Sequence, residues 1–169
     1  DLQSVDVFAF QGEARSLHID GRHEVAAITE LDIAECIVEN VRFTQQKFSY
    51  ADVSDVIFRN CDFSATTFPD RSRLNRVRFE DCRAAGMNMS GAELTDVTIE
   101  NGRLDLAMFR MAKLDHLTFR NVHATEIDFY GSNMTQCLLF DCDLQGINLE
   151  STTLKNVAFH GSDIHGLRG

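Results

Sequence analysis

The sequence predicts an all-β protein: a four-sided parallel solenoid in which five residues make one side and four sides make one coil. The first observation is a phrase that returns along the chain. "VIFRN" at 56–60 is followed 21 residues later by "VRFED", and then at steps of 20 by "VTIEN", "LTFRN" and "CLLFD". Such self-similarity at a fixed period is typical of repeat architectures.

The second observation is a finer period of five. An apolar residue occupies every fifth position over 33–68 and, after one extra residue within 69–73, over 74–164. A second apolar or small residue stands two positions before most of these. In a strand both positions point to the same face, whereas 3.6 residues per helical turn would spread a period of five around the helix. The pattern therefore predicts short strands joined by corners.

The third observation comes from grouping positions 20 residues apart. The corner that follows "VIFRN" and its copies is occupied almost throughout by Asn or Asp, which tolerate turn conformations. The residues at that corner are Asn40, Asn60, Asp81, Asn101, Asn121, Asp141 and Gly161. At about 4.8 Å between neighbouring coils, roughly seven coils predict a rod on the order of 34 Å long.

Composition limits the functions that this chain can have. Its 169 residues, 44% hydrophobic and 25% charged, suit one globular domain. A net charge of −10 disfavours direct binding to nucleic acid or to an anionic membrane and favours a cationic protein surface. No apolar run is long enough to span a bilayer and no signal peptide is visible, so we expect a soluble, cytoplasmic protein.

Residues 1–27 do not follow the period of five. They contain two strand-like pieces, "VDVFAF" and "SLHID", and a stack of repeats exposes an end that can pair with other strands. We therefore expect 1–27 to form an N-terminal cap over the first coil and 28–169 to form the repeat domain.

Several units resemble those of the pentapeptide-repeat family, which has a small residue, Asp or Asn, Leu or Phe, and then two polar residues. The best matches are "CDFSA" at 61, "AELTD" at 92, "SNMTQ" at 132 and "CDLQG" at 142. The resemblance covers roughly residues 26–167. It implies a right-handed quadrilateral β-helix and names no activity.

The chain offers little for catalysis or for metal binding. All five cysteines fall on inward positions, none forms a CxxC pair, and we expect buried, reduced thiols rather than a zinc site. His160 and His165 are expected to be solvated. No Ser-His-Asp set or Gly-rich phosphate motif is present, and a narrow filled interior offers no pocket. We therefore expect a protein without enzyme activity, cofactor or metal.

Charge supplies the candidate site. Acidic residues are expected to form rows along one side of the rod, and arginines interrupt these rows near the middle. We predict a partner-binding surface made of Asp32, Glu35, Asp52, Asp55, Arg73, Arg76, Glu93 and Asp96.

Two functions remain open at this point. The first is a non-enzymatic scaffold for protein–protein interaction, because solenoids offer extended side-chain arrays to partners. The second follows from the resemblance: some pentapeptide-repeat proteins resemble B-form DNA, bind DNA gyrase or topoisomerase IV, and protect against quinolones. The rod shape and net charge fit this mimicry, but Arg73 and Arg76 place positive charge within the acidic rows, and no apolar helix for dimerisation follows Ile164. We prefer the scaffold.

Overall fold

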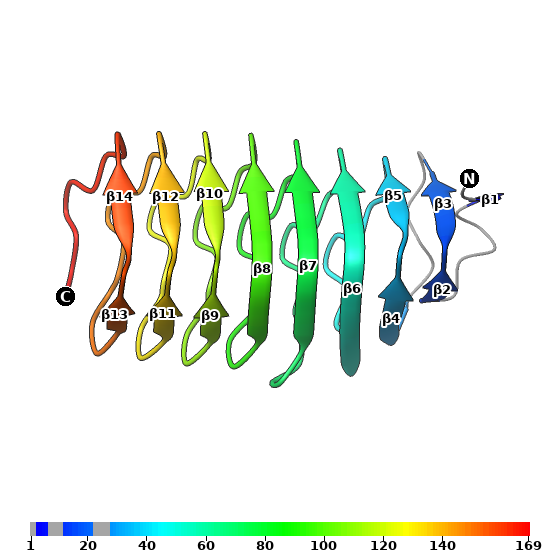
Figure 1. The fold of residues 1–169 in the computed structure, drawn as a ribbon, viewed down its shortest axis with the longest axis horizontal. Helices are drawn as coiled ribbons and strands as arrows, with labels where there is room; N and C mark the ends of the chain where they lie inside the picture. The colour runs from blue at the N-terminus through cyan, green and yellow to red at the C-terminus, as the bar shows by residue number, and fades with distance from the viewer. Residues whose placement is uncertain (1–2, 7–11, 22–27) are drawn as a thin grey trace.

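The computed structural model describes residues 3–6, 12–21 and 28–169 of the chain. Every regular element in these ranges is a β-strand, and the strands pair in parallel into one sheet that winds as a solenoid of about seven coils (Figure 1). The predicted all-β solenoid is therefore confirmed.

Three long strands form the middle of the stack. They are β6 (Tyr50–Arg59), β7 (Arg73–Glu80) and β8 (Glu93–Glu100), and each runs along two sides of the square. In the other coils the same two sides are separate short strands. These are β4 (Glu30–Ala34), β5 (Ile37–Glu39), β9 (Lys113–Asp115), β10 (Thr118–Arg120), β11 (Asn133–Thr135), β12 (Leu138–Phe140), β13 (Thr153–Lys155) and β14 (Ala158–His160).

The vertical register agrees with the predicted period. Phe119 lies between Ile99 and Leu139, one coil away on either side. The register changes once, where Val53 pairs with Leu74, 21 residues later. The corner that precedes β7 holds the extra residue, since the Ser72 amide there donates to the Pro69 carbonyl.

The N-terminal segment also lies in the stack. Strand β1 (Gln3–Asp6) pairs with β3 (Leu17–Asp20), β3 pairs with β5, and β2 (Glu13–Arg15) pairs with β4, all in parallel. The strand expected in "SLHID" is thus confirmed. The predicted cap extends over residues 1–2, 7–11 and 22–27, which lie outside the described residues, so its boundary at 27 stays a prediction.

Each coil changes direction at corners that carry a residue with positive φ. Four columns of such residues run along the stack. The corner within the long strands is one of them, with Ser16, Glu35, Asp55, Arg76, Asp96, His116, Gln136 and Asn156 all at φ between 53° and 58°. A left-handed residue turns the backbone within a single position, which is why a five-residue unit is long enough for a strand and a corner.

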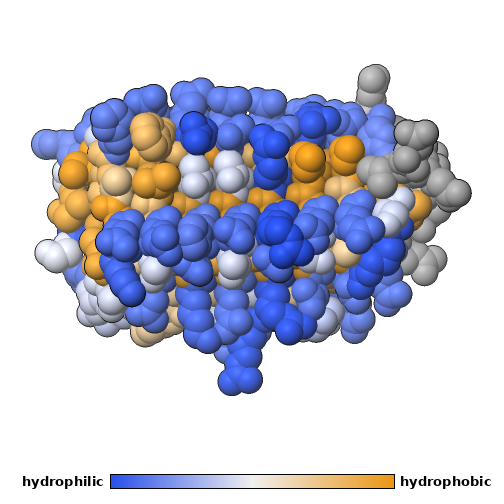
Figure 2. Space-filling view, viewed as in Figure 1, coloured by the Kyte–Doolittle hydropathy of each residue, from blue (hydrophilic) through white to orange (hydrophobic). Residues whose placement is uncertain are grey.

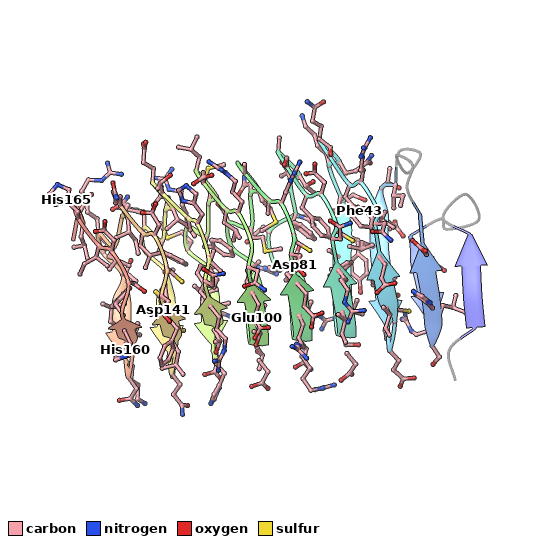
Figure 3. The ribbon with its side chains drawn as sticks, turned by 90° about the horizontal axis from the view of Figure 1, so that it is seen from above. Phe43, Asp81, Glu100, Asp141, His160 and His165 are labelled. Carbon is pink, nitrogen blue, oxygen red and sulfur yellow. The ribbon has the colours of Figure 1, made fainter. Side chains whose placement is uncertain are left out.

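Stacked apolar side chains fill the interior. Phe43, visible inside the stack in Figure 3, stacks on Phe63 with 4.8 Å between ring centroids, and Phe58 stacks on Phe79 at 5.1 Å. All five cysteines are buried and free, as expected. The interior therefore combines close packing with the absence of disulfides in the described residues.

Candidate protein-binding face

The eight predicted residues lie together on one face, in two neighbouring columns. The column in strand register contains Asp32, Asp52, Arg73, Glu93 and Lys113. The column at the left-handed corner contains Glu35, Asp55, Arg76, Asp96 and His116. We call these two columns the paired-charge face. Figure 2 shows hydrophilic side chains running along the stack beside a stripe of apolar ones.

Ion pairs across neighbouring coils neutralise the first column. Arg73 Nη2 lies 2.5 Å from Asp52 Oδ2, and Lys113 Nζ lies 2.5 Å from Glu93 Oε1. Asp32 is paired in the same way with Arg15 of β2, at 2.5 Å. The hydrogen bond from Lys113 lowers the pKa of Glu93 below its ordinary value. The column thus alternates in sign instead of forming an acidic row.

The second column contains the best-formed pair of this face. Arg76 donates two hydrogen bonds to Asp55, from Nε to Oδ1 and from Nη2 to Oδ2, both 2.6 Å long. This two-point geometry is specific to a guanidinium and a carboxylate. It lowers the pKa of Asp55 and raises that of Arg76. The predicted interruption by Arg73 and Arg76 is real, and the assignment of this face to partner binding stays a prediction.

A third charged column, which the sequence reasoning missed, runs along the next side. Arg59 pairs with Glu39 and, at 2.9 Å, with Glu80, while His18 Nε2 lies 2.9 Å from Glu39. The hydrogen bonds from His18 and from Arg59 lower the pKa of Glu39 despite its desolvation. The column continues through Glu100 to His160, both labelled in Figure 3. Reading every twentieth residue after the apolar position would have found it.

Amide side chains form a ladder at the Asn and Asp corner. Asn60 donates to Asn40 at 2.7 Å, Asn40 donates to Asp20 at 2.8 Å, and Asn121 donates to Asn101 at 2.9 Å. Here the prediction from residue type agrees with the structure, because identical amides one coil apart can bond to each other. The ladder holds neighbouring coils in register.

The carboxylate of Asp105 is the most enclosed acid of the sides behind the long strands, with a side chain 14% exposed. Desolvation by itself would raise its pKa, but hydrogen bonds from the Thr125 hydroxyl at 2.8 Å and from Arg103 Nε at 2.5 Å outweigh it and lower the pKa. A carboxylate held ionised in this way is poorly suited to exchange protons near neutral pH.

Other signs of a chemical site were sought over the ranges that the structure describes. They contain no group of three or more His, Cys, Asp or Glu side chains arranged to hold a metal ion. The fully buried polar residues there are Thr66, Ser72, Ser132 and Asn148, none of them ionisable. In the same ranges no helix is long and apolar enough to cross a membrane.

Comparison with known families assigns the chain to a class. The family described as pentapeptide repeat region matches residues 51–129, and that described as pentapeptide repeats (8 copies) matches residues 29–64 and 132–166. Together these matches span most of the chain. The protein therefore belongs to the pentapeptide-repeat family, as its units indicated. No curated protein matches the sequence.

Solved structures of similar fold include a pentapeptide repeat protein, Rfr23, from the cyanobacterium Cyanothece 51142, with a TM-score of 0.49 and 15% identity over 66% of this chain and 90% of that one. Full-length QnrB1, a plasmid-mediated fluoroquinolone resistance protein, gives 0.47 and 20% identity over 98% and 88%. HetL, involved in heterocyst differentiation regulation in the cyanobacterium Nostoc sp. strain PCC 7120, gives 0.32 and 13% identity over 94% and 87%. Function has to be argued from this chain's own residues.

Proposed function

We propose that this protein is a non-enzymatic scaffold that binds a protein partner through its outer faces. The observation that carries the proposal is the paired-charge face, where ion pairs between coils hold Asp52, Arg73, Asp55 and Arg76 in fixed positions. A rigid pattern of alternating charge complements one arrangement of charges on a partner and repels others. The cytoplasm is the compartment that we assume, in keeping with five unpaired thiols.

The arrangement of ionisable groups supports a binding role over catalysis. Catalytic acids and bases are commonly enclosed groups whose pKa values lie near the working pH. Asp105 is enclosed, but its pKa is shifted away from neutrality. The described interior is instead occupied by apolar side chains such as Phe109 and Phe129.

Mimicry of DNA is the second candidate, and the net charge of −10 on a rod-shaped stack favours it. A DNA mimic needs rows of uncompensated negative charge that resemble phosphates. On the paired-charge face the carboxylates of Asp52, Asp55 and Glu93 each have a cation within 2.6 Å. We therefore rank this candidate below a scaffold that reads patterned charge.

Affinity capture from the native cell tests the proposed function. We expect the wild-type protein to retain a specific protein, and the single reversal Arg73→Glu to release it. The matched control is the exchange Asp52→Arg with Arg73→Asp, which keeps an ion pair but inverts the pattern. Loss of capture in both variants supports recognition of the pattern, whereas unchanged capture in both would contradict a role for this face.

A supercoiling assay with purified DNA gyrase tests the second candidate. We expect little inhibition by the wild-type protein. Strong inhibition at low micromolar concentration that disappears in Asp52→Lys and Asp55→Lys variants, with the fold intact by circular dichroism, would make DNA mimicry the better account.

A further inference from the structure

A second surface, away from the paired-charge face, has an unusual composition. Met111 and Leu106 are the most exposed large apolar side chains in the described chain, at 62% and 58%. They occupy two successive corners of one coil, and the side between these corners carries the half-buried Met108. This single coil thus exposes three long apolar side chains along one side.

Both corner residues adopt a backbone conformation that disfavours them. Leu106 has φ 59° and Met111 has φ 55°, in the left-handed region where a Cβ is crowded. Other coils place glycine at the corresponding corners, as at Gly91 and Gly131 in the column of Met111. Long apolar residues here gain neither backbone comfort nor burial. Strain of this kind at an exposed position points to a binding role.

A hollow of about 540 Å³ lies beside Met111, lined by Asp70, Ser90, Gly91, Arg110, Met111 and Tyr130. Gly91 leaves its floor open, because a Cβ there would lie 1.8 Å from Asp70 Oδ1. The guanidinium of Arg110 lies 5.2 Å from the centre of the Tyr130 ring and its Nε lies 3.3 Å from Asp128. These contacts hold the aromatic wall in place, so the hollow is largely preformed.

The charge around this surface differs from that of the paired-charge face. Asp70 lies at the hollow, and Glu126 follows Leu106 one coil further along the same corner column. Over the described ranges neither carboxylate has an ion-pair partner, in contrast to Asp52 and Asp55. Uncompensated carboxylates beside an apolar surface favour a ligand that carries positive charge.

We propose that the surface formed by Leu106, Met108, Met111 and Tyr130, here called the Met111 surface, binds an extended segment of a partner protein. The segment presents one bulky apolar side chain to the hollow and a Lys or Arg to Asp70 or Glu126. This inference rests on the proposed scaffold function and specifies one of its surfaces. One side of three coils covers only on the order of 200 Å², against about 800 Å² per partner in a stable interface, which favours a short segment over a second copy of this chain.

Methyl NMR of the full chain labelled with ¹³C at the methionine methyl groups tests the proposal. Met108 and Met111 report on the surface, while the buried Met87, Met89 and Met134 serve as internal references. The probes are synthetic peptides of about seven residues, capped at both ends, with a central Leu or Phe and a Lys two positions away. We expect the signals of Met108 and Met111 to shift and the references to stay, with about tenfold weaker binding when Glu replaces Lys.

Met111→Gly is the variant of choice, because Gly91 and Gly131 occupy the same column and the fold is retained. We expect it to weaken peptide binding about tenfold, read from the Met108 signal. Ser151→Gly is the matched control, since Ser151 is an exposed residue with positive φ in that same column. It should bind the peptide like the wild type.

Several results would overturn the inference. They are an unmoved Met111 signal at millimolar peptide, equal binding of the Glu peptide, and unchanged binding by Met111→Gly. A dimer in sedimentation experiments that dissociates in Met111→Gly would replace the peptide with a second copy. If the cellular partner is captured equally well by Met111→Gly, this surface fails and the scaffold function stands; if the wild type captures nothing, the scaffold function fails.

Discussion

At the scale of single residues, the corners determine where side chains are tolerated. Residues with side chains occupy left-handed positions throughout the stack, as Asp55 and Arg76 do within the long strands. Asn and Asp adopt this conformation at lower cost than other residues, because their side chains bond to the local backbone. Leucine and methionine lack that compensation, so their corners are local weak points in the stability of the fold.

A pair of substitutions in one corner column measures this cost. Leu106→Gly removes a left-handed leucine and should raise the free energy of unfolding by about 0.5 kcal/mol, since relief of about 1 kcal/mol is partly offset by the entropy of glycine in the unfolded chain. Gly86→Ala, where a Cβ meets nothing within 4 Å, should lower it by about 1 kcal/mol. Urea unfolding provides the measurement. A Leu106→Gly variant less stable than the wild type would show that Leu106 packs against the protein.

At the scale of elements, each strand is stabilised mainly by the apolar side chains that it places on the strand of the next coil. Coils with a small residue at one inward position compensate at the next. Ala84 is followed by the buried Met87, and Ala124 by the buried Ile127. The interior thus stays filled although single positions change in volume.

Phe119 in β10 tests the contribution of one stacked position. Its side chain is fully buried between Ile99 and Leu139. Phe119→Ala should lower the free energy of unfolding by about 3 to 5 kcal/mol, because it leaves a cavity between two coils. Arg120→Ala, one position further on an exposed face, should change it by less than about 0.5 kcal/mol. Denaturant unfolding of both variants checks the prediction, and equal effects would contradict the inward assignment of Phe119.

The thiols test the same assignment by chemistry. Burial raises the pKa of Cys36, Cys61, Cys137 and Cys142, so the reactive thiolate is scarce as well as inaccessible. We expect a bulky maleimide to label none of the five cysteines in the folded protein and all of them in denaturant, as counted by mass spectrometry. Rapid labelling of the native protein at Cys61 would be inconsistent with its inward position.

At the scale of the whole molecule, ion pairs between coils link the stack along its length. Arg15 joins β2 to β4, Arg73 joins β7 to β6, and Lys113 joins β9 to β8. Each pair is exposed and contributes little by itself. As a set, these pairs make the stability of the rod depend on the ionisation of its carboxylates.

Acid unfolding measures that dependence. The pKa values of Glu39, Asp55, Glu93 and Asp105 are lowered by folding from ordinary values of 4.5 for Glu and 3.8 for Asp. Their contribution is complete above those values and is lost as the pH falls through the lowered ones. We expect the melting temperature to be nearly constant from pH 7 to about 5 and to fall below about pH 4.5.

Asp105→Asn is the control for the acid experiment. At pH 7 it should be less stable than the wild type by about 1 to 2 kcal/mol, because the amide cannot accept the same charged hydrogen bonds. The difference should shrink below about pH 4 as Asp105 becomes protonated. A difference that stays constant from pH 7 to pH 3 would assign the effect to packing instead.

Much of this architecture could be predicted from the sequence, for a simple physical reason. In a solenoid, residues 20 apart become neighbours, so spacing along the chain translates directly into position in space. The column of Ile99, Phe119 and Leu139 and the shared face of the eight charged residues both followed from counting. The change of register after Phe68 was also visible as one extra residue.

Other features depend on distances and directions that spacing does not contain. The pairing of Arg73 with Asp52 and of Arg76 with Asp55 depends on how far each side chain reaches across a coil, and it converted predicted acidic rows into neutralised ones. The place of β2 beside β4 departs from the period, because Glu13 pairs with Asp32 only 19 residues later. The hollow beside Met111 exists because a glycine, a carboxylate and a ring from three different coils meet at one corner. The sequence by itself determined the coil, its interior and which residues share a face; the tertiary structure decided which charges are neutralised and where the surface is open.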